Sequence, residues 1–155
     1  MASAQKIGRL GVTYQASRAL VWTFYGLLAV WTIICSVLFG LRGIEFSWSN
    51  AGQWGMIIFV VGYTWYFSLG IFFRAHLDPE GKLHLVSQRR TIVVEADQIP
   101  LVEGPHLPWG FVRFRLVREK GYLFSRAGDQ DLSRLLHAIK QLNPGVKFKN
   151  IGVRT

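Results

Sequence analysis

Two long uncharged stretches near the start of the sequence constrain the fold most strongly. Residues 19–41 and 46–73 contain no Asp, Glu, Lys, Arg or His, and only four residues separate them. The hydrocarbon core of a bilayer is roughly 30 Å thick, which about 20 apolar helical residues span. We therefore predict a transmembrane helical hairpin. A buried hairpin of a soluble domain is the alternative, but a chain of 155 residues has little protein to cover two such helices.

The remaining composition indicates one membrane anchor and one small domain. Half of the residues are hydrophobic, and most charged residues follow residue 73. The single cysteine, Cys35, lies inside the first stretch, so the chain has neither an internal disulfide nor a cysteine cluster for a metal.

The distribution of Lys and Arg predicts the orientation. Three bases and no acid precede the first stretch, and residues 74–155 carry 14 bases and 8 acids. Because bases are retained on the cytoplasmic side, both termini and the domain should be cytoplasmic, with residues 42–50 outside. We expect an integral protein of a bacterial inner membrane. A signal peptide is disfavoured, because the first stretch is too long and the second follows at once.

This reading divides the chain into four regions. They are a basic N-terminal segment (1–18), the hairpin (19–73), a β domain with a final helix (74–144) and a basic tail (145–155). In the first region, Ile7, Leu10 and Tyr14 recur at helical spacing. The segment is either a helix lying in the membrane interface or a tail that only sets the topology.

Small and aromatic residues are the candidate contact sites of the two spans. Small residues let helix backbones approach closely, so we expect these faces to pack against each other or against a partner's helix. Aromatic rings suit the headgroup layer. The helix-packing candidates are Thr32, Ser36, Gly40, Gly55 and Gly62, and the interfacial aromatic candidates are Trp22, Tyr25, Trp65 and Tyr66.

The spans contain no ionisable side chain, which disfavours a transport path. The hairpin is therefore an anchor or a docking surface. Tyr63, Trp65 and Tyr66 lie deeper than an interfacial belt requires. They face either lipid or a partner, which would be a protein, a quinone or a pigment.

The pattern after residue 73 predicts short antiparallel strands and one helix. Turn signals such as Asp78-Pro79-Glu80-Gly81 separate β-branched or alternating segments. Asp129 is placed to cap a helix whose apolar stripe ends before Asn143-Pro144-Gly145. The expected strands are 73–77, 82–87, 91–95, 99–103, 111–118 and 122–125, and the expected stripe is Leu132, Leu135, Leu136, Ile139 and Leu142. The predicted fold class is α+β, a small antiparallel sheet or partial barrel closed by an amphipathic helix.

This order of elements resembles bacterial membrane proteins that carry a pleckstrin-homology-like domain. The resemblance rests on the hairpin, the Gln98-Ile99-Pro100-Leu101-Val102 segment, the Arg-rich hairpin and the closing helix with Leu-Leu-His-Ala-Ile-Lys-Gln-Leu-Asn-Pro. It implies docking and scaffolding, and some proteins of this kind resemble assembly factors of membrane complexes, including photosynthetic ones. The full pattern has seven strands, whereas six are predicted here.

The sequence carries no recognisable catalytic or metal-binding motif. His76 and His84 can face each other across the turn at 78–81, but a metal would need a third ligand, so a surface pair is favoured. No nucleophile motif or phosphate-binding glycine loop is present. We expect no enzymatic activity and no cofactor. Nucleic-acid binding is also disfavoured, because no platform of aromatic and basic residues is evident.

The basic residues of the domain form the remaining candidate site. They contact either anionic headgroups or an acidic partner, unless they reflect only the charge bias of cytoplasmic segments. The candidate patch is Arg89, Arg90, Arg113, Arg115, Arg118 and Lys120. We expect a non-catalytic accessory subunit, scaffold or assembly factor of a larger membrane complex. The alternative is a module that senses anionic lipid.

Overall fold

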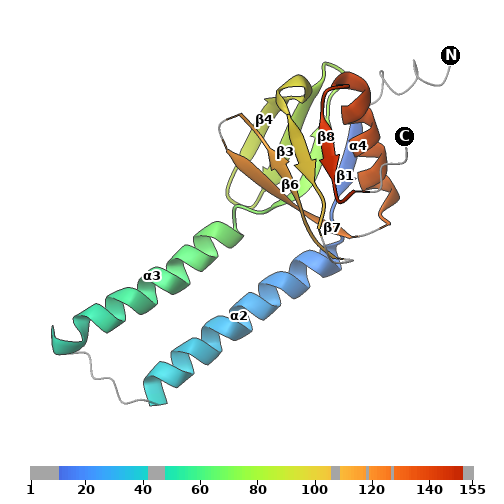
Figure 1. The fold of residues 1–155 in the computed structure, drawn as a ribbon. Helices are drawn as coiled ribbons and strands as arrows, with labels where there is room; N and C mark the ends of the chain where they lie inside the picture. The colour runs from blue at the N-terminus through green and yellow to red at the C-terminus, as the bar shows by residue number, and fades with distance from the viewer. Residues whose placement is uncertain (1–10, 42–47, 106–108, 118, 127, 152–155) are drawn as a thin grey trace. The chain divides into compact units, whose positions relative to one another are not determined.

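The computed structural model describes residues 11–41, 48–105, 109–117, 119–126 and 128–151 and divides the chain into two compact units (Figure 1). The helical unit is Arg18–Leu69. The sheet unit combines the chain up to Ser17 with the chain from Gly70 onward. The helical unit is therefore inserted into the sequence of the sheet unit, after its first strand.

The helical unit consists of α2 (Arg18–Leu41), the short 3-10 helix η1 (Trp48–Asn50) and α3 (Ala51–Ser68). Among the described residues, α2 is the one helix that is long and apolar enough to cross a membrane. The second predicted span, which contains α3, does not meet this criterion. The uncharged stretch 46–73 yields a helix of only 18 residues, and Gln53, Thr64 and several Tyr and Trp residues lower its mean hydropathy.

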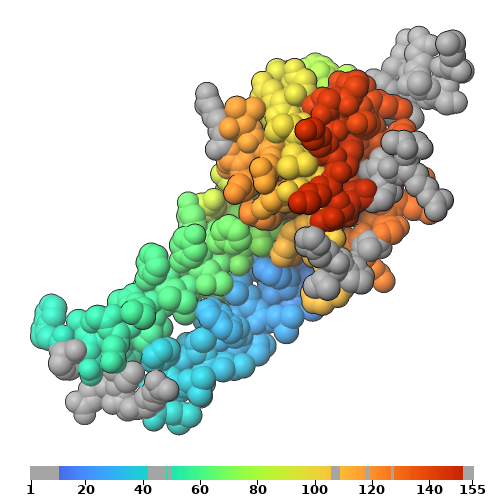
Figure 2. All heavy atoms as spheres, viewed as in Figure 1, coloured from blue at the N-terminus to red at the C-terminus, as the bar shows by residue number. Residues whose placement is uncertain are grey.

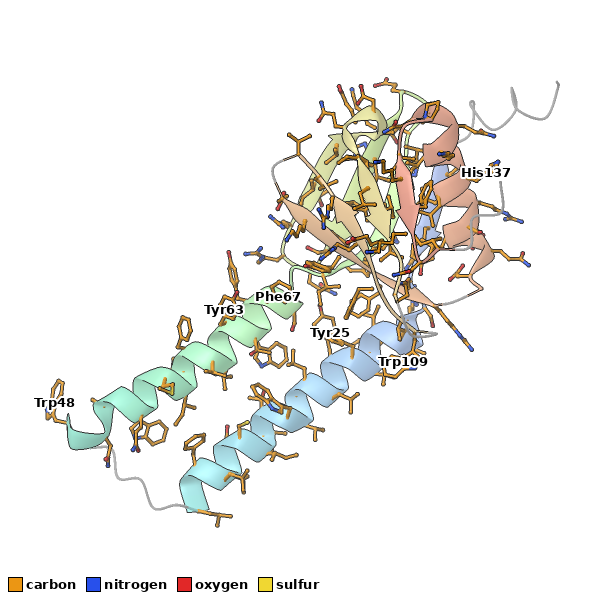
Figure 3. The ribbon with its side chains drawn as sticks, in the orientation of Figure 1. Tyr25, Trp48, Tyr63, Phe67, Trp109 and His137 are labelled. Atoms are coloured by element: carbon orange, nitrogen blue, oxygen red, sulfur yellow. The ribbon has the colours of Figure 1, made fainter. Side chains whose placement is uncertain are left out.

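Two hydrogen bonds join α2 to α3. The hydroxyl of Tyr25 donates to the carbonyl of Ser68 over 3.0 Å, and Nε1 of Trp65 donates to Oγ1 of Thr32 over 3.0 Å. Figure 3 shows Tyr25 between the two helices. The long side chains of Tyr25 and Trp65 therefore reach the other helix, and Thr32 is the small residue that accepts one of the two bonds.

The glycines of the predicted packing faces do not contact the other helix. A Cβ atom added to Gly40, Gly55 or Gly62 would meet no heavy atom within 4 Å. Ser36 donates its hydroxyl to the carbonyl of Thr32 in its own helix. Within the chain the three glycines thus leave open space beside them, whereas Thr32 accepts a hydrogen bond from Trp65 of the other helix. Packing against a partner's helix stays a prediction.

The sheet unit holds eight strands among the described residues, in the order β4-β3-β2-β7-β6-β5-β8, with β1 paired to β2. The strands are β1 Val12–Gln15, β2 Phe72–Leu77, β3 Lys82–Ser87, β4 Thr91–Glu95, β5 Leu101–Glu103, β6 Trp109–Arg115, β7 Lys120–Arg126 and β8 Lys147–Lys149. A 3-10 turn, η2 (Ala96–Gln98), precedes β5, and α4 (Gln130–Leu142) precedes β8.

The six predicted strands are present, with bounds that shift by a few residues. The expectation of a purely antiparallel sheet is wrong, because β2 pairs with β7 and β5 pairs with β8 in parallel. The sheet is mixed and is not a closed barrel. The parallel β5–β8 pair arises because α4 carries the chain back across the sheet before β8 begins.

Strand β1 was not predicted. Residues Val12–Gln15 pair antiparallel with β2, with Val12 opposite Leu77 and Gln15 opposite Arg74. The described part of the N-terminal segment is thus a strand and not an interfacial helix, whereas Ile7 and Leu10 lie outside the described residues. Tertiary pairing overrides the helical spacing of only three apolar residues.

Tyr14 fixes β1 to the core. Its side chain is 1% exposed, and its hydroxyl donates to the carbonyl of Phe124 over 3.0 Å. Burial raises the pKa of the Tyr14 phenol, and the charges of Asp129 and Asp131 raise it further. Beyond the strand, the amide of Ala16 donates to the carbonyl of Phe73 over 2.8 Å.

Helix α4 follows its sequence signals. The carboxylate of Asp129 accepts hydrogen bonds from the amides of Asp131 and Leu132, as an N-cap residue should. Four members of the predicted stripe are buried against the sheet, whereas Leu142 is half exposed. At the other end, the Asn143 side-chain amide donates to the carbonyls of Ala96, Asp97 and Ile99, so the helix end is held against η2.

We expect Tyr14→Phe to lower the free energy of unfolding by about 1–2 kcal/mol at neutral pH, because the carbonyl of Phe124 loses its buried donor. Tyr14 stays neutral in the folded protein, whereas it ionises in the unfolded chain near its ordinary pKa of 10.0. The contribution of the hydroxyl is thus complete below pH 10 and is lost as the pH rises. The difference between variant and wild type should narrow above pH 10 in denaturant titrations of the detergent-solubilised protein.

Tyr63→Phe on α3 is the matched control, since Tyr63 is largely exposed (Figure 3). An equal loss of stability in both variants would contradict the assigned role of Tyr14.

Candidate functional site

The arginines of the predicted basic patch contact two different carboxylates. Arg90, in the turn between β3 and β4, forms an ion pair with Glu119 at 2.7 Å, and Arg89 lies beside it in the turn. Arg113 and Arg115 on β6 approach Glu103 on β5. Arg118 lies outside the described residues. These contacts give partners to Arg90, Arg113 and Arg115, and a single patch made by all six bases stays a prediction.

Strand β8 adds two lysines to the β6 arginines. The register places Lys147 and Arg115 on either side of Leu101, and Lys149 and Arg113 on either side of Glu103. Cross-strand partners point to the same face of a sheet. The next strand, β7, contributes Lys120 opposite Arg115 and Tyr122 opposite Arg113. We call this the basic face, defined by Arg113, Arg115, Lys120, Lys147 and Lys149 (Figure 2 shows β8 in red).

Glu103 is the acidic residue at the centre of the basic face. Its side chain is only 13% exposed, and Arg113 hydrogen-bonds to it through Nε and forms an ion pair through a terminal nitrogen. Arg115 lies farther away, with a nitrogen 3.7 Å from the carboxylate. The hydrogen bond to Glu103 raises the pKa of Arg113. One carboxylate thus orients two arginines and leaves the face with a surplus of positive charge.

The second cluster of polar side chains surrounds Asp78. Nε2 of His76 and Nε2 of His84 each lie 2.6 Å from a different carboxylate oxygen of Asp78. Oγ1 of Thr13 on β1 lies 2.7 Å from Nδ1 of His76. The prediction that the two histidines face each other is confirmed, because they are register partners in β2 and β3.

This cluster links neighbouring strands through short polar contacts. Thr13 and His76 share a hydrogen bond, whereas Nε2 of His84 lies close to the carboxylate of Asp78 without the geometry of a hydrogen bond. Within the described part of the chain, no group of three or more His, Cys, Asp or Glu residues is arranged to hold a metal ion. The short contacts satisfy Asp78 from both strands that flank its turn and extend, through Thr13, to β1.

The predicted interfacial aromatic residues fall into two pairs. Trp22 and Tyr66 are exposed. Tyr25 and Trp65 are partly buried and make the two hydrogen bonds between α2 and α3. Tyr63 and Phe67 are also exposed on α3, so large aromatic groups are accessible along this helix in the described part of the chain (Figure 3).

No protein-family model, curated protein or solved structure matches the chain. Its described features are those of an α+β protein with one long apolar helix near the N-terminus and a mixed sheet packed against a C-terminal helix.

The sequence did not reveal how the basic tail joins the arginines of β6. Lys147-Phe148-Lys149 alternates like a strand, but three residues are too few to distinguish a strand from a tail. The sequence predicted Asp78 only as a turn residue. The signal for its contact with both histidines was that His76 and His84 face each other across that turn.

We expect Asp78→Asn to lower the free energy of unfolding by about 1 kcal/mol, the low end of the cost of leaving a polar group without its partner, because the cluster is partly exposed. An amide offers one acceptor oxygen where the carboxylate offers two, so one histidine loses its partner. Glu80→Gln in the same turn is the control, and its change should stay within about 0.5 kcal/mol at this surface pair with Lys82. Equal denaturation midpoints for both variants would contradict a stabilising role of the cluster.

Proposed function

We propose that the protein is a membrane-anchored, non-catalytic accessory subunit or assembly factor, whose helices anchor it and whose sheet unit docks to a larger membrane complex. The observation that carries the anchoring role is the pairing of β1 with β2 on either side of the helical insertion. The docking role is supported by uncovered helix surfaces and by the charged face of the sheet unit.

The pairing restricts how the chain can cross a membrane. Strand β1 ends at Gln15 and α2 begins at Arg18, while α3 ends at Ser68 and β2 begins at Phe72. Paired strands lie on one side of any bilayer. If α2 crosses, the chain must cross again before Phe72, and α3 is the helix available for that crossing among the described residues.

The dimensions of α3 are compatible with this return. Its 18 residues span about 27 Å at 1.5 Å per residue, close to the thickness of a bilayer core. It contains no charged residue, and its exposed side chains include Met56, Ile58 and Phe59. A helix of modest hydropathy is retained in a membrane more readily when both of its ends are tied to another span and a folded domain.

The same pairing argues against a removable signal sequence. A cleavage after α2 would separate Tyr14, which is buried in the core of the sheet unit, from the rest of that unit. The predicted resemblance to membrane proteins with a pleckstrin-homology-like domain agrees with a docking role. In this proposal both termini and the sheet unit face the cytoplasm.

An anionic-lipid-sensing module is the second candidate, and the surplus of bases on the basic face favours it. A protein in nanodiscs of neutral lipid that captured no membrane protein, but recruited anionic vesicles, would support this candidate.

We expect cysteines placed at Asn50 and Glu80, each in a Cys35→Ser background, to be labelled from opposite sides of the membrane. Asn50 lies at the start of α3 and Glu80 in the exposed turn between β2 and β3. An impermeant maleimide applied to right-side-out and inverted vesicles measures this. Labelling of both cysteines from the same side would contradict the hairpin.

We expect a membrane complex to co-purify in mild detergent with the wild-type protein and to be lost from Gly55→Leu/Gly62→Leu. A Cβ atom at either position meets no heavy atom within 4 Å in the described part of the chain, so the leucines should block a partner's helix and leave the protein folded. Mass spectrometry of the purified material measures the partners. Gly26→Leu is the matched control on α2, since it too faces open space. Wild-type protein that carries no membrane protein would overturn the docking role.

A further inference from the structure

We propose that the basic face binds an extended acidic segment of a protein partner. This inference rests on the docking role proposed above and adds the chemistry of the partner. Its three parts are the placement of the bases, their charge balance and their spacing.

The bases stand on two strands that flank β5. On β6, Arg113 and Arg115 are two residues apart and point away from buried Phe114. On β8, Lys147 and Lys149 are likewise two residues apart. Their registry with Leu101 and Glu103 puts all four bases on the outer face, in two rows separated by β5. Residues far apart in the sequence thus form one surface.

The charges of this surface are poorly balanced within the chain. Glu103 is the acidic side chain in the registered rows, and Arg113 is its principal partner. Among the described residues, no ion pair involves Lys120, Lys147 or Lys149. Arg115 is about half exposed, and its nearest nitrogen lies as far as 3.7 Å from the carboxylate of Glu103, which Arg113 also contacts. The face therefore retains basic groups that a carboxylate-rich ligand can pair with.

The spacing of the bases fits an extended polypeptide. Alternate residues of a strand repeat every ~6.8 Å, so the two bases in each row have the same repeat as alternate carboxylates of an extended segment. The two rows lie about 10 Å apart, two strand spacings, with Leu101 between them. An extended chain lying along β5 turns every second side chain toward the same row, so a segment with acidic residues at alternate positions can pair with the two bases of that row. A layer of lipid headgroups has no such repeat, so the geometry favours a protein ligand.

The test uses the full-length protein in nanodiscs of phosphatidylcholine and a fluorescent peptide of about ten residues with alternating Glu and Val. Fluorescence anisotropy should detect binding that weakens strongly between 50 and 500 mM NaCl. Lys147→Glu/Lys149→Glu should raise the Kd at least tenfold. Lys147→Arg/Lys149→Arg should leave it within twofold, since the charge remains.

The matched control is Lys82→Glu/Arg134→Glu, which changes the net charge equally on β3 and α4, away from the basic face. Its Kd should change less than threefold. A second peptide of the same composition, with its glutamates consecutive, should bind at least fivefold more weakly. Thermal melting of each variant verifies that the sheet unit is folded.

Several results would overturn the proposal. They are no binding of the alternating peptide, equal losses in the two charge-reversed variants, or equal affinity for the two peptides. A Lys147→Glu/Lys149→Glu protein that binds the peptide normally but no longer recruits vesicles with 30% phosphatidylglycerol would assign the face to lipid instead. Because the peptide is measured without a membrane partner, this proposal and the accessory role can fail separately.

Discussion

The antiparallel pairing of β1 with β2 is the interaction on which the architecture depends. Strand β1, which has four residues, precedes α2 in the chain. Its partner, β2, begins at Phe72, shortly after α3 ends at Ser68. Backbone pairing alone would be marginal for so short a strand, but the buried ring of Tyr14 and its hydrogen bond to Phe124 add a long-range anchor. Thr13 adds a contact to the cluster around Asp78. The two segments that flank the helical insertion in the sequence are therefore held together in one sheet.

This closure changes how the two helices should be interpreted. Considered separately, α2 has the length and composition of a membrane span and α3 does not reach the same criterion. Considered with β1 and β2, the crossings must come in an even number, since paired strands cannot lie on opposite sides of a bilayer. The pairing of β1 with β2 therefore restricts the membrane topology, whereas hydropathy evaluates each helix separately.

Local signals were sufficient for the elements that carry strong periodicity or caps. The long helix α2, the strands around the turn at Asp78 and the helix capped by Asp129 were all predicted from the sequence. Strands β1 and β8 were missed because each is short and is defined by a partner distant in the sequence. The candidate site was only partly predicted for the same reason. Arg113 and Arg115 were recognised from the sequence. Their association with Lys147 and Lys149 depends on the parallel pairing of β5 and β8. Gly55 and Gly62 face open space within the described part of the chain, so their packing against a partner's helix stays a prediction.

The most direct test of this account is a disulfide across the insertion. Gln15 and Arg74 are register partners, and opposed Cα atoms in an antiparallel pair lie about 4.5–5.5 Å apart, within the range of a disulfide. The measurement uses Gln15→Cys/Arg74→Cys in a Cys35→Ser background, with a protease site placed in residues 42–47 and mild oxidation in native membranes. We expect the two fragments to stay joined after cleavage until a reductant is added, whereas the fragments of Gln15→Cys/Glu80→Cys should separate. Fragments of Gln15→Cys/Arg74→Cys that separate without reductant would contradict the pairing of β1 with β2 and the topology derived from it.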